Sequence, residues 1–564
     1  MALLFRNVDA RQVLLSRLPS LELRTRIAML GTFKGAGFTT APFVLADMAP
    51  GGGQAQLVHW ATCGPGDGDD ADTGRADGAM EQGAPGYALR NAEGQPVDMR
   101  WAKTCVHRLG GRALLREQRF WVDLPQGQSV RPEVDGEHPG VLCRGALLET
   151  LDRDAVCERF YLPISVLGGQ QQAILAMAVG SDGMKYRGGW VFMDRVHKAD
   201  DNAEHLCRWM LEHRPDLPVH FVLDRRSADW PRLEREGFPL LPYHSREHFL
   251  ALANAEWLVS SHVDPPVADP MGMRDLTGQP PYKLAFLQHG VIKDDLSRWL
   301  NQIRLDFMVT STKQEYASLL GGRYKLTERE LDLTGLPRHD ALLRKVTARR
   351  PGRAVLFCPT WREHLRLGGP NMYQAHASGL HPDETRHFRQ SDFFRAWSGV
   401  TGSGSLARLA KERSCKLLFL PHPELVRFLP LFPRSDAFTF LDWSALGSVQ
   451  DFLVGCAVAV TDYSSLAFEF GYMGRPVAYY QFPEKPDIYA THVWQKGYFD
   501  CAAHGLGPVV RTTGELEAWL DDTMRHGGQR QELYEHRADA FFTLRDGQNC
   551  RRTFEAILAR SAQT

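Results

Sequence analysis

A repeated alternation of short apolar runs and longer stretches with helical spacing constrains the fold of this sequence more than any other feature. A first series starts after Gly188 and comprises the runs WVFMDR, VHFVLD, EWLVSSH, YKLAFLQHG and RLDFMVTST. A second series follows the segment LTGLPRHDALL and comprises AVLFCPTWR, KLLFLPHPE, FTFLDW, VGCAVAVTD and RPVAYY. Such runs, apolar on both faces and alternating with helices, are typical of parallel strands covered by helices on both sides. The two series predict an α/β fold with two Rossmann-like, doubly wound domains.

The length of the chain agrees with several folding units. Its 564 residues exceed what one core usually organises, since single domains typically hold about 100–200 residues. We expect an N-terminal accessory module at residues 1–167 and a first Rossmann-like domain at 168–334. A second Rossmann-like domain is expected at 335–520, followed by a C-terminal helical segment, 521–564, that packs back across the domain boundary.

The N-terminal module has the pattern of β structure. Its short pieces QLVHWAT, RFWVDL and FYLPISVLG are separated by Gly, Pro and Asp, which favours a β-rich unit. A Gly- and Asp-rich segment at residues 63–86 cannot bury a core and is expected to form an exposed loop. Its acids suggest a calcium site, but their spacing lacks the closing Glu and central Gly of a calcium loop and so favours a solvated loop. These acids are Asp67, Asp69, Asp70 and Asp72.

Charge and composition exclude some classes of partner. The 66 basic and 67 acidic side chains leave no positive excess that would attract nucleic acid. No apolar run has the roughly 18–20 residues needed to cross a bilayer, and charges interrupt the N-terminus too often for a secretory signal. The ten cysteines form neither a CxxC pair nor a Cys/His metal spacing, which indicates reduced thiols. A cytoplasmic protein is therefore expected.

Polar residues with useful chemistry follow the apolar runs. In open α/β sheets, ligands bind outside the carboxyl ends of the strands, so the residues that end each run are candidates for the site. The first series supplies Asp194, Arg195, Asp224, His262, Gln288, His289 and Gly290. The second supplies Thr360, Arg362, His422, Asp462, Tyr463, Ser464 and Ser465.

The tetrapeptide DYSS has the pattern of an anion site. If Val454–Thr461 is a buried strand, Ser464 or Ser465 can cap a helix that begins near Leu466. The free amides of that first turn would then face the cleft and bind a phosphate together with the serine hydroxyls. The alternative is that the serines only cap the helix.

Two histidines are candidates for acid and base chemistry. His289 precedes a glycine at a strand end, where an exposed imidazole with a pKa near its reference value of ~6.5 can accept a proton from a hydroxyl. His422 lies between Pro421 and Pro423, which restrict its backbone, and it could donate to a phosphoryl oxygen or a leaving group. Structural roles for both histidines remain the alternative.

Other charged residues allow two interpretations each. Arg338 and Arg362 follow turns or strands and are suited to phosphate, although an arginine bound to a carboxylate looks the same in sequence. Asp294 and Asp295 could hold a metal, but adjacent acids at a helix start are more typical of caps. We expect no metal site.

Taken together, these stretches resemble the CDP-glycerol glycerophosphotransferases, the teichoic-acid-type polymerases and primases and their relatives in capsule and surface-polymer synthesis. The resemblance spans Trp190 to Trp519 and does not include the N-terminal module. Each matching piece is short, and their order makes the resemblance specific. In order, the pieces are QHG, LTGLPRHD, FCPTWR, LPHPE, VQDFLVGCAVAVTDYSSLAFEFGYMGRPVAYY and KGYFDCAAHGLGPVV.

The resemblance implies a fold and a reaction. The family is similar to GT-B glycosyltransferases, with two Rossmann-like domains facing a cleft. Its activity would be transfer of glycerol phosphate from CDP-glycerol to a hydroxyl of a growing polymer or primer, with release of CMP. The first domain would be the acceptor side and the second the donor nucleotide-binding side, and no cofactor or metal would be required. A lipid-linked acceptor would bring the protein to the inner face of the membrane, and an oligomer is possible.

The resemblance also implies roles for residues. The two functional histidines of the family correspond to His289, as the base, and His422, on the donor side. The donor phosphate contacts correspond to Thr360, Arg362, Asp462, Tyr463, Ser464 and Ser465, with Arg338 placed among them as a positioning residue and with Gly290 and Glu469 in support.

One departure leaves the substrates open. Many family members have an aromatic residue before the His-Gly pair, where this chain has Gln288. The acceptor hydroxyl could belong to a sugar, a ribitol or glycerol unit, or a lipid-linked primer, and the donor could be CDP-ribitol or another activated polyol. The stretch DLSRWL is expected to line the acceptor side.

Two other functions fit the same pattern. A GT-B glycosyltransferase or a sugar-nucleotide epimerase would use the same two-domain scaffold with a sugar nucleotide. An inactive scaffold of a polymer-assembly complex would keep the fold, but it would be expected to lose the histidines or the DYSS turn, which this chain retains.

Overall fold

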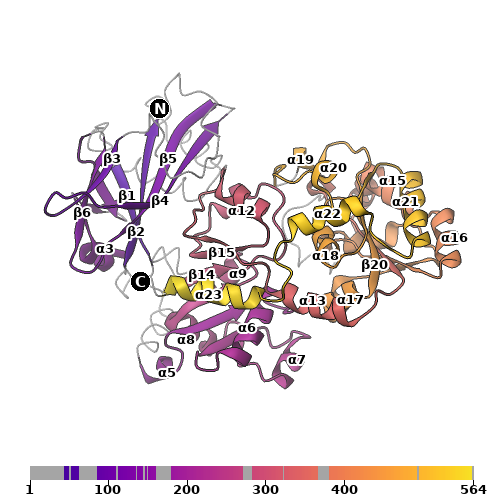
Figure 1. Cartoon of the computed structure of the whole chain (residues 1–564), viewed down its shortest axis with the longest axis horizontal. Coiled ribbons are helices and arrows are strands. Elements are labelled where there is room, and N and C mark those ends of the chain that lie inside the picture. The colour runs from indigo at the N-terminus through magenta and orange to yellow at the C-terminus, as the bar shows by residue number, and fades with distance from the viewer. Residues whose placement is uncertain are drawn as a thin grey trace.

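The protein has three parts arranged in a row, an N-terminal β module followed by two α/β domains (Figure 1). C-terminal helices run over both α/β domains. The computed structural model describes residues 43–49, 53–62, 86–109, 112–134, 136–143, 146–148, 150–160, 180–270, 282–321, 323–365, 380–491 and 494–561.

The first α/β domain is built on a seven-stranded, wholly parallel sheet in the order β12-β11-β10-β13-β14-β15-β16. Both faces are buried, since Val191 and Met193 pack into one hydrophobic cluster and Trp190 and Phe192 into another. The strands are β10 (Gly189–Met193), β11 (Val219–Leu223), β12 (Leu240–Pro242), β13 (Ala255–Ser260), β14 (Lys283–Phe286), β15 (Phe307–Thr310) and β16 (Leu331–Leu333). The helices are α5 (Ser181–Met184), α6 (Asn202–His213), α7 (Trp230–Arg235), α8 (Arg246–Asn254), α9 (Pro265–Ala268), α11 (Ser297–Leu300) and α12 (Lys313–Leu320).

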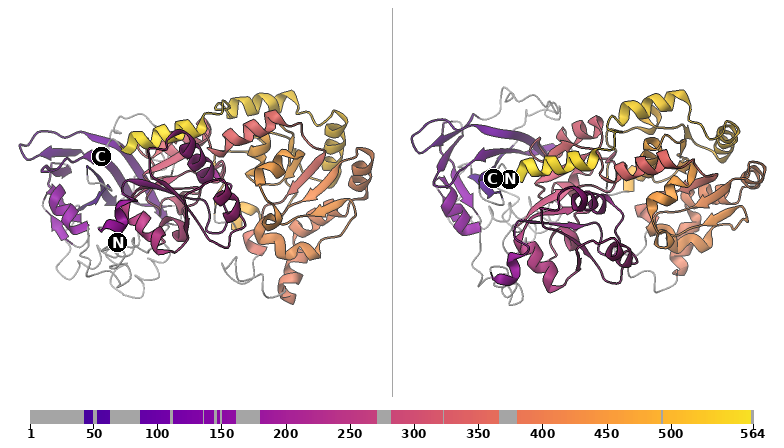
Figure 2. Two further views of the ribbon diagram at one scale, coloured as in Figure 1. Left: turned by 90° about the horizontal axis from the view of Figure 1, so that it is seen from below. Right: turned by 60° about the horizontal axis from the view of Figure 1, so that its bottom comes forward.

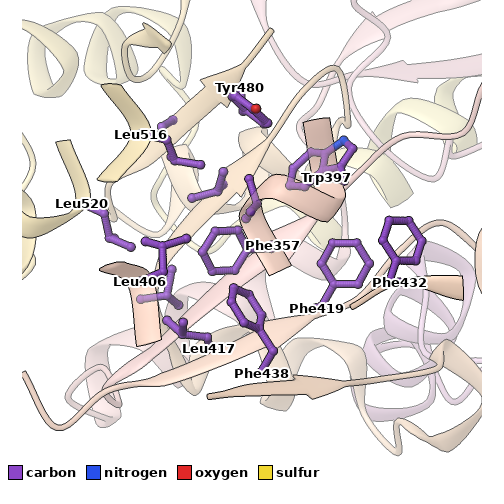
Figure 3. Close-up of a cluster of buried hydrophobic side chains, with 14 of the residues drawn as sticks. Phe357, Trp397, Leu406, Leu417, Phe419, Phe432, Phe438, Tyr480, Leu516 and Leu520 are labelled. Atoms are coloured by element: carbon purple, nitrogen blue, oxygen red, sulfur yellow. The ribbon is translucent and has the colours of Figure 1, made fainter. Parts of the chain in front are cut away.

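The second α/β domain has a six-stranded parallel sheet in the order β19-β18-β17-β20-β21-β22. Figure 3 shows aromatic and aliphatic side chains such as Phe357, Trp397 and Phe419 packed on one face of this sheet. The strands are β17 (Ala354–Cys358), β18 (Lys416–Phe419), β19 (Phe438–Phe440), β20 (Cys456–Thr461), β21 (Val477–Tyr480) and β22 (Val509–Val510). The helices are α13 (Arg338–Ala348), α14 (Pro382–Gln390), α15 (Asp392–Thr401), α16 (Gly404–Glu412), α17 (Val449–Val454), α18 (Leu466–Tyr472), α19 (Ile488–Thr491), α20 (Cys501–His504) and α21 (Thr513–Arg525), with the 3₁₀ turns η4 (Glu363–Leu365), η5 (Pro423–Leu431) and η6 (Trp443–Ala445).

These two sheets confirm the predicted fold of two doubly wound domains, with one difference at a strand boundary. Val454 was expected to begin a strand, but it ends helix α17, and β20 begins only at Cys456. The helix forms because the Ser448 side chain caps it by accepting a hydrogen bond from the Asp451 amide. Of the long polar stretch before β18, residues 382–390 form helix α14, and residues 366–379 lie outside the described part.

The N-terminal module is β-rich, as predicted. Most of its pairings are antiparallel, and Val44, Leu57 and Val122 are among the residues of its core. A six-stranded sheet contains β4 (Met99–Leu109), β5 (Arg112–Asp123), β2 (Gln54–Thr62), β1 (Phe43–Met48), β7 (Gly140–Cys143) and β8 (Ala146–Leu148), and a three-stranded sheet contains β3 (Tyr87–Asn91), β6 (Ser129–Val134) and β9 (Leu151–Asp152).

Two expectations for this module have other outcomes. Phe160, the first residue of a predicted apolar strand, ends helix α3 (Arg153–Phe160), and the rest of that piece lies outside the described residues. Residues 63–85 of the Gly- and Asp-rich segment, which include the four acids considered for calcium, also lie outside them.

The β module docks on the first α/β domain through charged and aromatic side chains. The Arg329 guanidinium lies 3.7 Å from the ring centroid of Trp121, and its Nε donates to Gln54 Oε1 at 3.1 Å. Lys325 Nζ lies 3.4 Å from Glu117 Oε1, a fully buried carboxylate of the module. These contacts attach the module to the side of the domain that carries β15 and β16.

The C-terminal helices connect the two α/β domains. The helices are α22 (Glu532–Phe541) and α23 (Asn549–Ser561), and α23 lies along the first domain in both Figure 1 and Figure 2. The Asp340 carboxylate accepts the amides of Asn549 and Cys550 at 2.9 and 2.8 Å, which fixes the start of α23 against α13. At its other end, the Ser561 hydroxyl accepts a 2.8 Å hydrogen bond from Trp257 Nε1.

None of the helices in the described part has both the length and the apolar composition of a membrane span. The eight cysteines whose surroundings are described are buried and free of disulfide bonds.

Candidate active site

A cavity of about 500 Å³ lies where the carboxyl ends of the two parallel sheets face each other. The first domain contributes the residues after β10 and β14, and the second contributes those after β17, β18 and β20. Most of the strand-end residues predicted from the two series therefore line one cavity, as expected for ligand sites in open α/β folds. Four of them do not line it: Asp224, His262, Arg362 and Asp462.

His289 is presented by a constrained turn after β14. Gln288 before it is 1% exposed and has φ of 61°, a conformation that is uncommon for a non-glycine residue. The Asn202 side chain donates to the Gln288 carbonyl at 2.8 Å and holds this turn. The His289 ring is exposed to the cleft and stacks on His262, with centroids 4.7 Å apart and planes 8° apart.

The surroundings keep His289 neutral at pH 7. Its position deep in the cleft, followed by the charge of Arg195, lowers its pKa to about 4, although Asp201 acts in the opposite direction. A hydrogen bond from the ring to the Ser261 backbone acts in the opposite direction and raises the pKa of His289, because a carbonyl that accepts from the ring favours its protonated form. A ring that donates to Ser261 keeps its other nitrogen free to accept a proton.

His422 lies on the opposite wall, directly after β18. Its Nδ1 accepts a hydrogen bond from the Glu424 amide at 3.3 Å, so the neutral ring carries its proton on Nε2. Burial, followed by the charges of Arg195 and His289, lowers its pKa to about 4. The Trp361 ring packs beside it with centroids 5.9 Å apart. Neutral His422 can thus donate a hydrogen bond from Nε2.

The DYSS turn lies between β20 and α18. Asp462 Oδ1 accepts the amides of Thr360 and Tyr463 at 2.8 and 2.7 Å, so this carboxylate holds the turn together. The Ser464 hydroxyl accepts the Leu466 amide at 3.2 Å, whereas Ser465 is exposed and makes no side-chain cap bond. The turn therefore offers the Ser465 hydroxyl, and the half-buried Tyr463 beside it, to the cleft.

Gly290 brings the two domains into close approach. A Cβ atom built at this position would lie 3.2 Å from Ser465 Oγ. The His-Gly turn of the first domain and the DYSS turn of the second thus meet across the cleft. A residue with a side chain at position 290 would crowd Ser465, which explains why glycine occupies it.

Thr360, predicted to contact the donor, lies in the cavity wall. It is 7% exposed, it lines the cavity, and its hydroxyl has no hydrogen-bond partner among the described residues. An unpaired buried hydroxyl is costly, so a ligand oxygen at this position would satisfy it.

Arg362 and Asp462, named among the expected donor contacts, pair with each other behind the DYSS turn. Arg362 is 1% exposed and does not line the cavity. Its Nε and Nη2 donate to Glu484 at 2.8 and 2.9 Å, its Nη1 donates to the Thr360 carbonyl, and Nη2 also lies 2.9 Å from Asp462 Oδ2. Because these donors are occupied by protein groups, both residues brace the turn from behind.

Arg338 is likewise engaged with carboxylates. Its Nη1 donates to Asp201 at 2.6 Å and its Nη2 pairs with Glu469, so it links a loop of the first domain to α18 of the second. Burial alone would raise the pKa of Glu469, but the charges of Arg338 and His339 outweigh it and hold that pKa below its usual range. Arg338 therefore links the two walls of the cavity through its ion pairs with Asp201 and Glu469.

The adjacent acids considered for a metal have protein partners. Asp294 pairs with Lys293 and accepts from the Tyr489 hydroxyl at 3.1 Å, while Asp295 accepts the Ser297 amide at 2.8 Å. In the described part of the chain, no group of three or more His, Cys, Asp or Glu residues is arranged to hold a metal ion.

Several residues that line or adjoin the cavity have no role predicted from the sequence. Arg195 and His262 were noted only as strand ends, and their Nε–Nε2 hydrogen bond depends on β10 and β13 being neighbours. The aromatic residues at strand ends were a signal that could have been used. Trp299, within the stretch DLSRWL, lines the cavity as expected, and three further tryptophans do so: Trp361, Trp443 and Trp494.

The fold and the cleft together define a GT-B-like protein, in which two Rossmann-like domains face one another across a ligand site. The sequence pattern of the CDP-glycerol:poly(glycerophosphate) glycerophosphotransferases matches residues 187–559. The chain therefore belongs to this family, as the resemblance predicted.

Individual relatives share parts of the chain. The minor teichoic acid biosynthesis protein GgaB of Bacillus subtilis is 30% identical over 376 residues, which are 65% of this chain and 39% of GgaB. The teichoic acid ribitol-phosphate polymerase TarL of Staphylococcus aureus is 24% identical over 250 residues, 42% of this chain and 38% of TarL. This chain thus spans about two fifths of the length of these relatives.

A solved structure of the wall teichoic acid polymerase TagF is also similar. It covers 70% of this chain and 94% of the TagF chain, with 15% sequence identity and a TM-score of 0.47. Because this TM-score lies below 0.5, the fold assignment rests on the strand orders of the two sheets described above.

Proposed function

We propose that the protein transfers glycerol phosphate, or a related polyol phosphate, from a CDP-alcohol to a hydroxyl of a surface-polymer acceptor and releases CMP. The observation that carries this proposal is the placement of His289 and His422 on opposite walls of one cleft, beside the hydroxyls of Thr360 and Ser465. Membership of the glycerophosphotransferase family and the teichoic acid relatives support the same reaction.

His289 would act as the general base. The acceptor hydroxyl must lose a proton as its oxygen attacks phosphorus, and a neutral imidazole with one free ring nitrogen can take it. Stacking on His262 and the fixed Gln288 turn would orient the ring, so that acceptor and donor meet in a defined geometry.

The second domain would bind the donor and stabilise the leaving group. Negative charge grows on the oxygen between the transferred phosphorus and CMP as that bond breaks. His422 Nε2–H, the Thr360 hydroxyl and the Ser465 hydroxyl are the donors that face this region, and preorganised donors of this kind stabilise developing charge. A bound phosphate would also raise the pKa of His422, since an adjacent anion favours the imidazolium.

The pH dependence of kcat/KM follows from the lowered pKa of His289. The base is neutral above a pKa of about 4, so the rate should fall only as the pH drops through that value. An imidazole at its usual pKa of about 6.5 would lose about nine tenths of its base form by pH 5.5. We therefore expect kcat/KM at pH 5.5 to remain close to its value at pH 7. A steep loss centred near pH 6.5 would contradict the assignment.

Stability must be followed in the same experiment. The folded-state pKa values of His289 and His422 lie below the unfolded value, so the unfolded chain binds more protons between about pH 6.5 and pH 4. The stability contribution of each histidine therefore falls as the pH falls through that window. Circular dichroism at each pH separates loss of activity from loss of structure.

Substrate comparison tests the reaction itself. The chain should release CMP from CDP-glycerol or CDP-ribitol in the presence of a polyol-phosphate primer, with mass spectrometry showing the extended primer. UDP-sugars and GDP-sugars serve as controls. Turnover of a sugar nucleotide without release of CMP from either CDP-alcohol would replace the proposed function with a glycosyltransferase or an epimerase.

The acceptor and its location form part of the same proposal. We propose a polymer or lipid-linked acceptor that enters from the first domain, where Trp299 lines the cavity and the buried Gln288 shapes the His-Gly turn. We also propose that the protein works in the cytoplasm and contacts the inner membrane face when the acceptor is lipid-linked. Cell fractionation with and without the lipid-linked primer would test this location.

A further inference from the structure

The cations that line the cavity differ in whether a carboxylate neutralises them. Arg338 pairs with Asp201 and Glu469, and Lys293 pairs with Asp294. Among the described residues, the other two basic side chains of the cavity wall, Arg195 and Lys198, form no ion pair with a carboxylate. Lys198 instead donates to the Trp443 carbonyl at 3.4 Å. Since Arg362 is buried behind the wall, a phosphate in the cavity would find Arg195 as its available guanidinium.

Arg195 is anchored through one nitrogen only. It follows β10, its side chain is exposed to the cleft, and its Nε donates to His262 Nε2 at 2.9 Å. No other side-chain hydrogen bond of Arg195 is formed within the described part of the chain. The two terminal Nη groups are thus left to form the two-pronged contact with which guanidinium groups bind phosphate oxygens.

His262 has the protonation state that this anchor requires. It is 8% exposed, and because its Nε2 accepts from Arg195, the ring is neutral with its proton on Nδ1. Burial, followed by the charges of His289 and Arg195, holds its pKa well below the usual value. Its face stacks on His289, so one buried ring contacts both Arg195 and the predicted base.

We propose that Arg195 binds the phosphate group at the reaction centre and that His262 is its positioning residue. This inference rests on the proposed function and adds to it a guanidinium whose terminal nitrogens are available to a phosphate. The ligand is a phosphate-class oxyanion, supplied either by the pyrophosphate of the donor or by the terminal phosphodiester of the acceptor polymer.

The reaction step shows what Arg195 would do. A bond forms between the acceptor oxygen and the transferred phosphorus, and the bond from that phosphorus to the bridging oxygen breaks, so CMP leaves with the electron pair. The acceptor proton goes to His289. Arg195 would bind oxygens of the transferred phosphate, whose charge is spread in the transition state, and a fixed guanidinium stabilises that charge without reorganisation.

The placement of Arg195 relative to both histidines supports this role. Its charge lowers the pKa of His289 on the first wall and that of His422 on the second. The guanidinium therefore lies within electrostatic reach of the base and of the leaving-group side, where the transferred phosphate must be.

Binding of phosphate probes to the full chain tests the proposal without turnover. Binding is measured by calorimetry with two probes, CDP and sn-glycerol 3-phosphate. Arg195→Ala should lower the affinity for at least one of them by ~10–100-fold, which is the range for a lost charge-assisted hydrogen bond. Arg195→Lys should recover part of the affinity, because lysine keeps the positive charge but cannot form the two-pronged contact of a guanidinium. Arg187→Ala removes an exposed arginine of the same domain outside the cavity and should change neither affinity.

The pattern of losses identifies the source of the phosphate. Loss of CDP affinity alone assigns Arg195 to the donor pyrophosphate, and loss of sn-glycerol 3-phosphate affinity alone assigns it to the acceptor. Unchanged affinity for both probes, or failure of the wild-type chain to bind either, overturns the proposal. Binding through Arg195 without any turnover of CDP-alcohols would keep this inference and reject the proposed function.

The positioning role of His262 needs a separate comparison. His262→Gln retains a side-chain oxygen that can accept from Arg195 Nε, whereas His262→Leu does not. We expect His262→Leu to bind the probes as weakly as Arg195→Ala does, and His262→Gln to bind them more tightly than His262→Leu. The two His262 variants should have the same melting temperature, so that the comparison reports binding and not stability. Equal affinity in the Gln, Leu and wild-type proteins would show that His262 does not position Arg195.

Discussion

Replacing His289 with alanine should lower the turnover of phosphate transfer at least ~100-fold, which is the usual contribution of a general base. The ring is exposed to the cleft and its protein contacts are the stack on His262 and the bond to the Ser261 backbone. Its loss should therefore change the melting temperature little, and the decrease should lie in kcat. Steady-state assays of CMP release, with CDP-alcohol and primer varied separately, measure it.

The control and the companion variant make this result specific. His536 is 72% exposed on α22, away from the cavity, and His536→Ala should retain full activity. His422→Ala should also reduce turnover, but with a larger change in the apparent affinity for the CDP-alcohol, because His422 belongs to the domain that we propose to bind the donor. Full activity in both the His289 and the His422 variants would refute the proposed mechanism.

Most of the fold could be predicted from the sequence, because parallel strands that are buried on both faces appear as short, continuous apolar runs. Runs such as WVFMD and AVLFC became β10 and β17, and the polar residues that end them meet at one cleft, as strand geometry requires. The boundary at Val454 was wrong because an apolar residue before a strand can equally end a helix, and the cap at Ser448 decided between them.

Which charges are available for a ligand could not be predicted in the same way. Arg362 and Glu484 are 122 positions apart, and Arg338 and Asp201 are 137 apart, so no local signal shows that these guanidinium groups are already bound. Arg195 looks equally charged in sequence, but its only side-chain hydrogen-bond partner among the described residues is a neutral histidine 67 positions away. The distinction between an arginine that binds substrate and one that braces a wall depends on long-range pairing.

Arg362 braces the DYSS turn, so its loss should have a large effect on stability. Arg362→Ala should destabilise the second α/β domain by about 3–5 kcal/mol, because removal of one member of a buried ion pair leaves its partners charged and unpaired. Asp462 is fully buried and the Glu484 side chain is 6% exposed, so water can solvate neither well. Scanning calorimetry should show the melting transition of this domain lowered by ~10 °C.

Two measurements separate a bracing role for Arg362 from a phosphate-binding role. If Arg362 contacted the donor, its loss would raise the KM for the CDP-alcohol and leave the melting temperature unchanged. If it braces the DYSS turn, the triple variant Arg362→Met, Asp462→Asn and Glu484→Gln should recover most of the lost stability, since replacing a whole buried charge network is often nearly neutral. The Asp462→Asn change removes the charge but keeps a side-chain oxygen that can accept from the Thr360 and Tyr463 amides, so the turn should persist. If the triple variant does not regain stability, the loss in Arg362→Ala cannot be due to unpaired buried charges alone. The ion pairs among Arg362, Asp462 and Glu484 would then themselves be needed to hold the DYSS turn.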